Sequence, residues 1–330
     1  MLTNPRAFLA LLVLVLASTA FAQGSRDKIE ILKPANYAAP AFDRSEELQT
    51  VLKSAVDDVT TKYSFKPGEM AATVIDLRDP NKLLIADVNG EARLYTASVV
   101  KMFYMAALHR QLEDGKITLT KELERGLRDM IVDSSNDATG YILDVLTDTS
   151  SGGELPQKEF DLWQYKRNRV NRFFASLGYQ NININQKTFC EDAYGIEQQS
   201  RAYKGQNRNM LTTNATARLM AEIALRRFVN EQRSNAMLEL MGRDWAKPSN
   251  DPDSQAVAFT GKALIDNKMT GAKLWSKAGW TSKSRHDAAY VETPDGLKFV
   301  IVVFTENHAN ERDAIPQIAT LVMKGMKRAQ

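Results

Sequence analysis

The stretch RLYTASVVKMFYMAAL, residues 93–108, places Ser98 and Lys101 three positions apart at the start of an apolar segment. From Ser98 to Asp114 the residues are apolar almost all round a helical projection, so we expect a buried helix that ends at Gly115. Residues three apart share one face of a helix, which would bring the amine of Lys101 towards the hydroxyl of Ser98.

This pair allows two interpretations. Burial among apolar neighbours lowers the pKa of a lysine, and a neutral amine can accept the proton of a serine and activate it as a nucleophile. A helix N-terminus also favours negative charge on that serine oxygen. The alternative is a capping serine followed by a lysine whose amine reaches solvent. The same spacing occurs at Ser25 and Lys28, where nothing else suggests chemistry.

The composition is that of an ordinary globular protein. The chain has 330 residues, of which 44% are hydrophobic and 25% are charged, and its formal net charge is +3. This length is ample for one large domain or two subdomains. The near balance of charge gives no reason to expect a nucleic-acid partner.

The first 22 residues have the composition of a secretory signal peptide. Arg6 precedes an apolar run over residues 8–17, and a small-x-small end follows at residues 20–22. This three-part pattern predicts cleavage after Ala22. The apolar run is well short of the ~20 residues that span a bilayer, so we expect no stable membrane insertion. We therefore expect a secreted or periplasmic protein in which residues 23–44 form a tether.

Disulfide, metal and nucleotide chemistry have little support in the sequence. Cys190 is the only cysteine, which excludes an intramolecular disulfide, and an isolated cysteine is most often buried. The three histidines, His109, His286 and His308, form no His-Glu-x-x-His pair, and no metal-ligand cluster is evident. Neither a phosphate-binding Gly-rich loop nor a Gly-x-Ser-x-Gly elbow occurs. We therefore expect no metal and no other cofactor.

The predicted elements run from strands through a helical block and back to strands. Ser45 can cap a helix over residues 45–63, and two strands, residues 71–77 and 82–88, are joined by a turn. Further helices are expected over residues 98–114, 121–130, 138–146, 160–177, 213–228 and 309–327, and further strands over residues 273–281, 287–293 and 298–305.

This order predicts an α/β fold of the α+β type. Strands at both ends of the chain predict one antiparallel sheet flanked by helices, and the helical block predicts a second, all-helical lobe. We place the sheet lobe at about residues 45–97 and 256–330 and the helical lobe at about residues 98–255. Ser98 would then lie beside the cleft between the lobes, where sites usually form.

Two further motifs follow the Ser98 pair along the chain. Residues 134–136 are Ser-Ser-Asn, and residues 277–279 are Lys-Ala-Gly, within a predicted strand. In this order the three motifs resemble the Ser-x-x-Lys, Ser-x-Asn and Lys-[Thr/Ser]-Gly signatures of class A β-lactamases and penicillin-binding proteins. The flanking segments TASVVKM, SSNDATGYIL and RHDAAYVETPDG resemble the class A branch. The resemblance covers about residues 45–330 and implies the β-lactamase/transpeptidase-like fold.

The resemblance implies four catalytic residues. Ser98 would be the acylated nucleophile, and Lys101 would accept or relay its proton. Ser134 would pass a proton to the leaving nitrogen. Lys277 would hold Ser134 and attract the substrate carboxylate. Each role suits the donors and acceptors of its side chain.

The resemblance also implies three substrate-binding residues. Asn136 would hydrogen-bond the substrate amide. The backbone N–H groups of Ser98 and Trp280 would form an oxyanion hole for the tetrahedral intermediate. Gly279 marks a place in the strand where another backbone can approach closely.

Three departures from the family pattern affect function. Ala278 lacks the hydroxyl that normally helps to bind the substrate carboxylate, so Thr281, Ser282 or Arg285 would have to compensate. The 36 positions between Ser98 and Ser134 are several helical turns fewer than in typical class A members, which predicts a more open site.

The third departure concerns deacylation. Class A enzymes carry a glutamate in a Glu-x-x-Leu-Asn setting that activates water. Glu197 fits best by its distance from Thr212, with Glu191 as the alternative, but neither has Leu-Asn after it. The other interpretation of either glutamate is a solvated carboxylate on a loop. Without this base, acylation would proceed while deacylation is slow.

Three functions follow from these observations. The first is an exported serine acyl-hydrolase that opens the β-lactam amide through a Ser98 acyl-enzyme. The second is a peptidoglycan D,D-carboxypeptidase or transpeptidase acting on D-Ala-D-Ala. The third is a sensor module that binds penicillin or wall peptides without turnover. A glutaminase of the same fold is disfavoured by the signal peptide. In each case we expect a monomer with a small-molecule substrate, a β-lactam or a D-Ala-D-Ala-like peptide.

Overall fold

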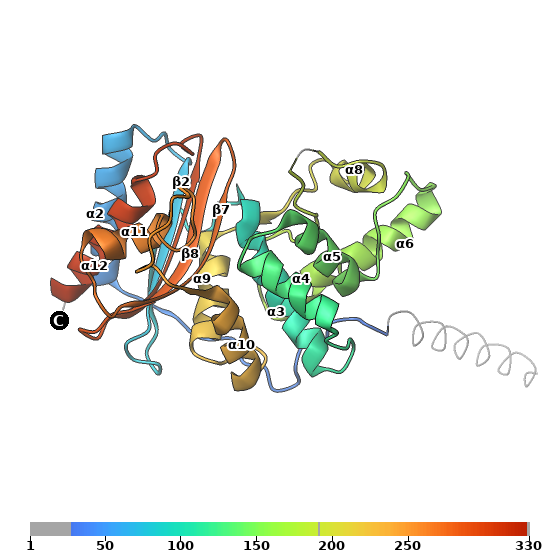
Figure 1. Cartoon of the computed structure of the whole chain (residues 1–330), viewed down its shortest axis with the longest axis horizontal. Coiled ribbons are helices and arrows are strands. Elements are labelled where there is room, and N and C mark those ends of the chain that lie inside the picture. The colour runs from blue at the N-terminus through green and yellow to red at the C-terminus, as the bar shows by residue number, and fades with distance from the viewer. Residues whose placement is uncertain (1–27, 191, 329–330) are drawn as a thin grey trace, which may run out of the picture.

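The computed structural model describes residues 28–190 and 192–328, so the predicted signal peptide and Glu191 lie outside the described residues. Figure 1 shows a twisted sheet with helices on both faces, and beside it a lobe built mainly of helices. This arrangement confirms the predicted fold class. Within the described ranges, no helix combines the length and the apolar character that crossing a membrane requires.

The sheet joins the two ends of the chain. Its seven strands follow the order β1-β3-β2-β9-β8-β7-β6, and β2 is hydrogen-bonded to β9 over its whole length. All neighbouring strands are antiparallel except β1 and β3. The bounds are β1 Asp43–Arg44, β2 Met70–Asp76, β3 Leu84–Val88, β6 Gly242–Arg243, β7 Lys273–Trp280, β8 Ser284–Glu292 and β9 Lys298–Glu306.

Helices cover both faces of this sheet (Figure 1). On one face α2 (Glu46–Tyr63), α11 (Phe259–Asp266) and α12 (Ala314–Arg328) bury an apolar cluster with residues of the strands. Ser45 caps α2, as predicted, by accepting a hydrogen bond from the backbone N–H of Leu48. On the other face α9 (Thr213–Ala224) contacts β2, β8 and β9 and separates the sheet from the helical lobe.

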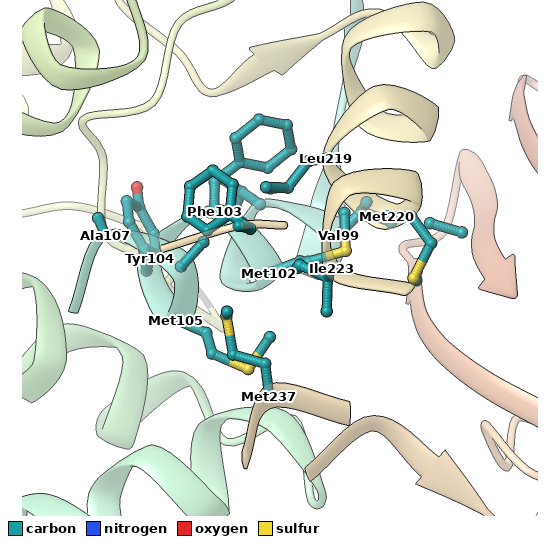
Figure 2. Close-up of a cluster of buried hydrophobic side chains, with 14 of the residues drawn as sticks. Val99, Met102, Phe103, Tyr104, Met105, Ala107, Leu219, Met220, Ile223 and Met237 are labelled. Atoms are coloured by element: carbon teal, nitrogen blue, oxygen red, sulfur yellow. The ribbon is translucent and has the colours of Figure 1, made fainter. Parts of the chain in front are cut away.

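The helical lobe is organised around α3 (Val100–Glu113), which is buried over almost its whole length. Figure 2 shows its side chains Met102, Phe103 and Met105, together with Val99 of the preceding turn, near Leu219, Met220 and Ile223 of α9 and Met237 of α10. The other helices of the region are α4 Lys121–Ile131, α5 Asn136–Thr147, α6 Gln157–Arg167, α7 Arg169–Ser176, α8 Ile196–Arg201 and α10 Glu231–Met241. A two-stranded ladder of β4 (Leu94–Tyr95) and β5 (Met210–Leu211) completes it.

Some predicted elements differ from the structure. The single helix predicted over residues 160–177 is wrong, because the chain breaks at Asn168 into α6 and α7. Helices α8, α10 and α11 were not predicted. The first residues of the central helix form a separate 3-10 turn, Ala97–Val99, before α3 begins.

Residues 28–44, predicted as a tether, lie against the domain. The carboxylate of Glu30 forms ion pairs with Arg169 and Arg172 of α7. Ile31 is buried, and the hydroxyl of Tyr37 donates hydrogen bonds to the carboxylate of Glu222 in α9. This segment therefore connects elements of both lobes.

Candidate active site

A cleft of about 840 Å³ lies between the lobes. Its walls come from six parts of the chain: the 3-10 turn, the α4–α5 loop, residues 189–190, Arg243 of β6, the loop before α11, and the end of β7 with the turn after it. Ser98, Ser134, Asn136, Gly279 and Trp280 all line it. The sequence motifs therefore converge on one cavity.

The 3-10 turn before α3 presents Ser98. Ala97, directly before it, has a φ of +44°, in the left-handed region that non-glycine residues rarely adopt. The helix caps assigned to the turn and to α3 are Thr96 and Val99, and neither makes a side-chain capping bond. The interpretation of Ser98 as a helix cap is therefore wrong, and its half-buried side chain lies at the cleft.

The amine of Lys101 is withdrawn from solvent. Its side chain has no exposed surface, and Nζ lies 2.5 Å from the carbonyl oxygen of Ser134 and 2.8 Å from Oδ1 of Asn136. Burial lowers the pKa of Lys101 to about 7. The alternative of a lysine that extends into solvent is therefore wrong. A pKa near neutrality suits this amine to accepting a proton, and its hydrogen bonds within the described residues are to Ser134 and Asn136 and not to Ser98.

The hydroxyl of Ser134 lies between two lysine amines. Its Oγ is 3.2 Å from Nζ of Lys101 and 2.9 Å from Nζ of Lys277. Ser134 has a φ of +56°, a conformation that costs on the order of 1 kcal/mol for a non-glycine residue. Strain of this kind concentrates at functional sites, and here it holds the hydroxyl between the two amines.

Lys277 reaches the cleft from strand β7. Nζ donates hydrogen bonds to Oγ of Ser134, to the backbone carbonyl of Ala278 at 2.8 Å and to Oε1 of Gln255 at 2.8 Å. Burial, with the nearby charges of Lys101 and Arg243, lowers the pKa of Lys277 well below its ordinary value. The two amines therefore lie buried on either side of Ser134, where burial favours their neutral forms.

Gly279 allows strand β7 to lie against the 3-10 turn. A Cβ atom at this position would lie 2.7 Å from the backbone nitrogen of Ser98 and 3.0 Å from that of Val99. Such distances are too short for a real side chain, so only glycine fits without a shift of backbone. The next residue, Trp280, lines the cleft with 53% of its surface exposed.

Asn136 and Cys190 lie together on the helical side of the cleft. Asn136 begins α5, and its Nδ2 donates a hydrogen bond to Sγ of Cys190 at 3.3 Å. The expectation that the lone cysteine is buried is wrong, because Cys190 is exposed and lines the cavity. The amide of Asn136 thus connects this thiol to the amine of Lys101.

Two site residues were not predicted. Gln255 accepts hydrogen bonds from Lys277 and from the backbone N–H of Ala278, and its Nε2 donates to the carbonyl of Val132 at 3.0 Å. Arg243 donates to the carbonyls of Ser276 and Ile131, and burial lowers its pKa to about 10. Both side chains connect the sheet to the α4–α5 region, and no sequence motif marks either of them.

Glu197 is not among the residues that line the cleft. It is 1% exposed in α8, and its carboxylate accepts hydrogen bonds from the guanidinium of Arg167 at 2.8 and 3.1 Å and from Ser151 at 2.9 Å. Lys187 lies 3.5 Å from the same carboxylate. The interpretation of Glu197 as a solvated loop carboxylate is therefore wrong, because it belongs to a buried ion pair.

Of the three residues considered as substitutes for the missing hydroxyl, two line the cleft and one does not. Thr281 and Ser282 border the cavity directly after Trp280. Arg285 is 2% exposed, pairs with Asp253 at 2.6 Å, and lies over the ring of Phe259 at 3.9 Å. Compensation from Thr281 or Ser282 is thus compatible with the geometry, whereas Arg285 is engaged elsewhere.

No group of histidine, cysteine or acidic side chains in residues 28–190 and 192–328 has an arrangement that could hold a metal ion. The cleft offers several hydroxyls, those of Ser98 and Ser134 among them, together with amide groups, a thiol and three carboxylates, and the buried amines of Lys101 and Lys277 contact Ser134. Such a set supports acyl transfer through a serine nucleophile with lysine as the base.

The model of the beta-lactamase enzyme family matches residues 51–326. The chain belongs to this family. No curated protein sequence matches it. The family assignment and the solved structures of the same fold support a serine β-lactamase-like enzyme.

Solved structures share the fold at low identity. A β-lactamase from Sphaerobacter thermophilus has 20% identity and a TM-score of 0.58, over 85% of this chain and 96% of its own. A β-lactamase from Chitinophaga pinensis has 18% identity and a TM-score of 0.58, over 84% and 99%. A variant of PBP-A, solved as an acyl-enzyme complex with penicillin G, has 17% identity and a TM-score of 0.58, over 88% and 99%. These likenesses extend over nearly the whole described domain.

Proposed function

We propose that this protein is an exported serine hydrolase of the class A β-lactamase type, which opens the β-lactam amide through an acyl-enzyme on Ser98. The observation that carries the proposal is the position of the Ser134 hydroxyl, within hydrogen-bond distance of the amines of both Lys101 and Lys277. A hydroxyl between two buried amines that can exchange protons with it is suited to passing a proton to a leaving nitrogen.

Acylation begins with proton transfer to the neutral amine of Lys101. Oγ of Ser98 loses its proton to Nζ and forms a bond to the lactam carbonyl carbon, whose oxygen becomes an oxyanion. The backbone N–H groups of Ser98 and Trp280 stabilise that charge. The intermediate then collapses with cleavage of the C–N bond. The leaving nitrogen takes its proton from Ser134, which regains one from Lys101, so that all protons are accounted for.

The substrate carboxylate binds near Lys277 and Arg243. Arg243 lines the cleft, and Lys277, which is buried, contacts Ser134 directly. A carboxylate bound next to Lys277 would favour the protonated form of its amine. Thr281 or Ser282 supplies the hydroxyl that Ala278 lacks. Asn136 donates an amide hydrogen bond to the acyl side of the substrate. This placement puts the leaving group towards Lys277 and the acyl group towards Asn136 and Cys190.

Deacylation is the slow step under this proposal. Both carboxylate oxygens of Glu197, the candidate base, are hydrogen-bonded to Arg167, and the buried carboxylate does not line the cleft, so it is not positioned to activate water there. A long-lived acyl-enzyme also suits the second candidate, a penicillin-binding D,D-peptidase or sensor. That candidate is favoured by the same ion pair and by the fold shared with PBP-A.

One experiment separates these functions. The mature protein is incubated with a chromogenic cephalosporin and, separately, with a fluorescent penicillin, and turnover and covalent labelling are followed together. Many turnovers that disappear in Ser98→Ala support the lactamase. A stoichiometric adduct that persists supports the peptidase or sensor and contradicts efficient hydrolysis. Failure of both readouts contradicts the acyl-serine assignment.

A further inference from the structure

A second cavity of about 470 Å³ adjoins the cleft on its helical side. The two cavities share Phe189, Cys190, Thr281 and Ser282, so a ligand in one can extend into the other. We refer to the second cavity as the side pocket. Asn136 and Lys277 do not line it, and of its lining residues the acylation chemistry above uses only Thr281 or Ser282, at the border between the two cavities.

The side pocket carries an excess of positive charge. Its lining includes four basic side chains and a single acidic one, Glu306; the basic ones are Lys187, Arg201, Arg208 and Lys283. Two of these are neutralised locally, because Lys187 pairs with Asp144 at 2.6 Å and Arg201 pairs with Asp192. The basic side chains of the pocket that are not paired in this way are Arg208 and Lys283.

Arg208 and Lys283 have no ion-pair partner within residues 28–190 and 192–328. The guanidinium of Arg208 lies over the ring of Tyr95 at 4.5 Å, which orients it without neutralising it. Lys283 is exposed in the turn between β7 and β8, next to Ser282, whose hydroxyl faces the same space. Two cations without an ion-pair partner, one held over an aromatic ring and one in a short turn, favour an anionic ligand.

The acidic residues of the cleft lie outside the side pocket. Asp133, Asp251 and Asp253 line the cleft but not the side pocket, and Asp253 is paired with Arg285 and Arg312. An acidic substituent on the acyl side is therefore favoured in the side pocket over the part of the cleft that these carboxylates line.

We infer that the side pocket is a specificity subsite for an anionic acyl substituent, a carboxylate on the group attached to the carbonyl that Ser98 attacks. The inference rests on the proposed function, since it takes the acyl side of the substrate to lie towards Asn136 and Cys190. Arg208 and Lys283 hold the carboxylate, and Tyr95 keeps the guanidinium in place.

Three penicillins with one nucleus test this inference. Benzylpenicillin, carbenicillin and ampicillin differ at the carbon next to the side-chain carbonyl, which carries hydrogen, a carboxylate or an ammonium group. Second-order rate constants for formation of the Ser98 adduct are measured for each by competition with a fluorescent penicillin. We expect carbenicillin to react fastest and ampicillin slowest. The ratio of carbenicillin to benzylpenicillin should fall as salt is added, because exposed charges are screened.

Charge variants locate the effect. In the double variant Arg208→Gln/Lys283→Gln the carbenicillin to benzylpenicillin ratio should fall by about three- to tenfold, the size expected for two exposed ion pairs. The variant Arg208→Glu/Lys283→Glu should make ampicillin the preferred of the two charged substrates. The matched control Lys121→Gln/Lys158→Gln removes two positive charges from exposed positions outside both cavities and should keep the wild-type ratio.

The outcomes distinguish failure of the subsite from failure of the proposed acyl-serine function. Adducts that form with all three penicillins, at ratios unchanged by the side-pocket variants, overturn the subsite and leave the acyl-serine mechanism standing. Failure of all three to form an adduct on Ser98 overturns both. A ratio that changes equally in the Lys121→Gln/Lys158→Gln control shows long-range attraction by net charge and also overturns the subsite.

Discussion

Nζ of Lys277 lies 2.9 Å from Oγ of Ser134, across the boundary between the sheet and the helical lobe. Strand β7 supplies the amine and the α4–α5 loop supplies the hydroxyl. Any change that moves the lobes apart therefore moves the hydroxyl of Ser134 away from the amine of Lys277. The catalytic geometry depends on how tightly the sheet and the helices pack.

Replacing Ser134 tests the proton relay. We expect Ser134→Ala to lower the acylation rate constant by about 10²- to 10⁴-fold, the usual contribution of a positioned acid or base. Stopped-flow labelling with a fluorescent penicillin measures this directly. The neighbouring Ser135 is a matched control, because its hydroxyl caps α5 by accepting from the N–H of Ala138 at 3.1 Å.

Ser135→Ala should lower the free energy of unfolding by about 1 kcal/mol, the usual value of a helix cap, while acylation remains near the wild-type rate. Equal losses of acylation in the two variants would mean that the loop conformation, rather than the Ser134 hydroxyl, is what the reaction needs.

The buried lysine predicts the pH dependence of acylation. Because burial lowers the pKa of Lys101 to about 7, the amine is protonated below that pH and becomes a base above it. The acylation rate constant should therefore rise with pH through a midpoint near 7. The buried histidines His109 and His286, whose pKa values burial lowers to about 4, titrate well below this range.

Lys101→Arg provides the control for this assignment. A guanidinium stays protonated throughout the accessible range, so the variant should lose acylation at every pH. A rising limb near pH 7 that persists in Lys101→Arg would assign the titration to another group.

Gly279 should tolerate no side chain. In Gly279→Ala the new Cβ would meet the backbone nitrogen of Ser98 at 2.7 Å, so either β7 or the 3-10 turn must move. We expect a loss of about 1–3 kcal/mol in the free energy of unfolding, typical of overpacking, and a loss of acylation of about tenfold or more. Gly153→Ala, where a Cβ meets nothing within 4 Å, is the matched control.

Chemical denaturation and adduct formation measured on both variants check this prediction. Acylation at the wild-type rate in Gly279→Ala would show that the turn carrying Ser98 adapts without cost.

The sequence predicted the parts of the site that local patterns can encode. Each of the three motifs belongs to one element, the 3-10 turn, the α4–α5 loop or strand β7. The sequence predicted the loop and the strand, but it predicted one helix from residue 98 and not the separate 3-10 turn that carries Ser98. The same reasoning placed the N- and C-terminal strands in one sheet, as the pairing of β2 with β9 confirms.

The parts that it missed depend on contacts between distant segments. Gln255 lies in an irregular segment before α11, and Arg243 lies in a two-residue edge strand. Neither has a periodic or motif signal. Their role is evident only from hydrogen bonds to residues distant in the sequence, Gln255 with Lys277 and Arg243 with Ser276. The burial of Glu197 was missed for the same reason, since its partner Arg167 is 30 residues away on α6.

The pair of Glu197 and Arg167 should be structural. Glu197→Gln leaves a guanidinium buried with reduced compensation, so we expect a loss of about 3–5 kcal/mol in the free energy of unfolding. The rate constant for loss of the acyl-enzyme should remain within about twofold of wild type, because the carboxylate is not at the cleft. Chemical denaturation and decay of the fluorescent adduct give the two quantities.

A double variant provides the control. Arg167→Met/Glu197→Met removes both charges, so it should be more stable than Glu197→Gln. An acyl-enzyme that persists many times longer in Glu197→Gln than in wild type would instead assign Glu197 to deacylation.

Cys190 offers a chemical probe of the cleft. Its thiol is exposed and accepts a hydrogen bond from Asn136, so a group added to sulfur enters the space that the acyl side of the substrate would occupy. Treatment with N-ethylmaleimide should therefore slow acylation of Ser98 by about tenfold or more, since the amide of Asn136 is displaced. Cys190→Ser, which keeps a small hydrogen-bonding side chain, should acylate normally and resist the reagent.

Conversely, protein already acylated by benzylpenicillin should label more slowly at Cys190. Labelling at an unchanged rate in the acyl-enzyme would mean that the acyl group leaves the cleft in another direction, and the placement of the side pocket on the acyl side would fail with it.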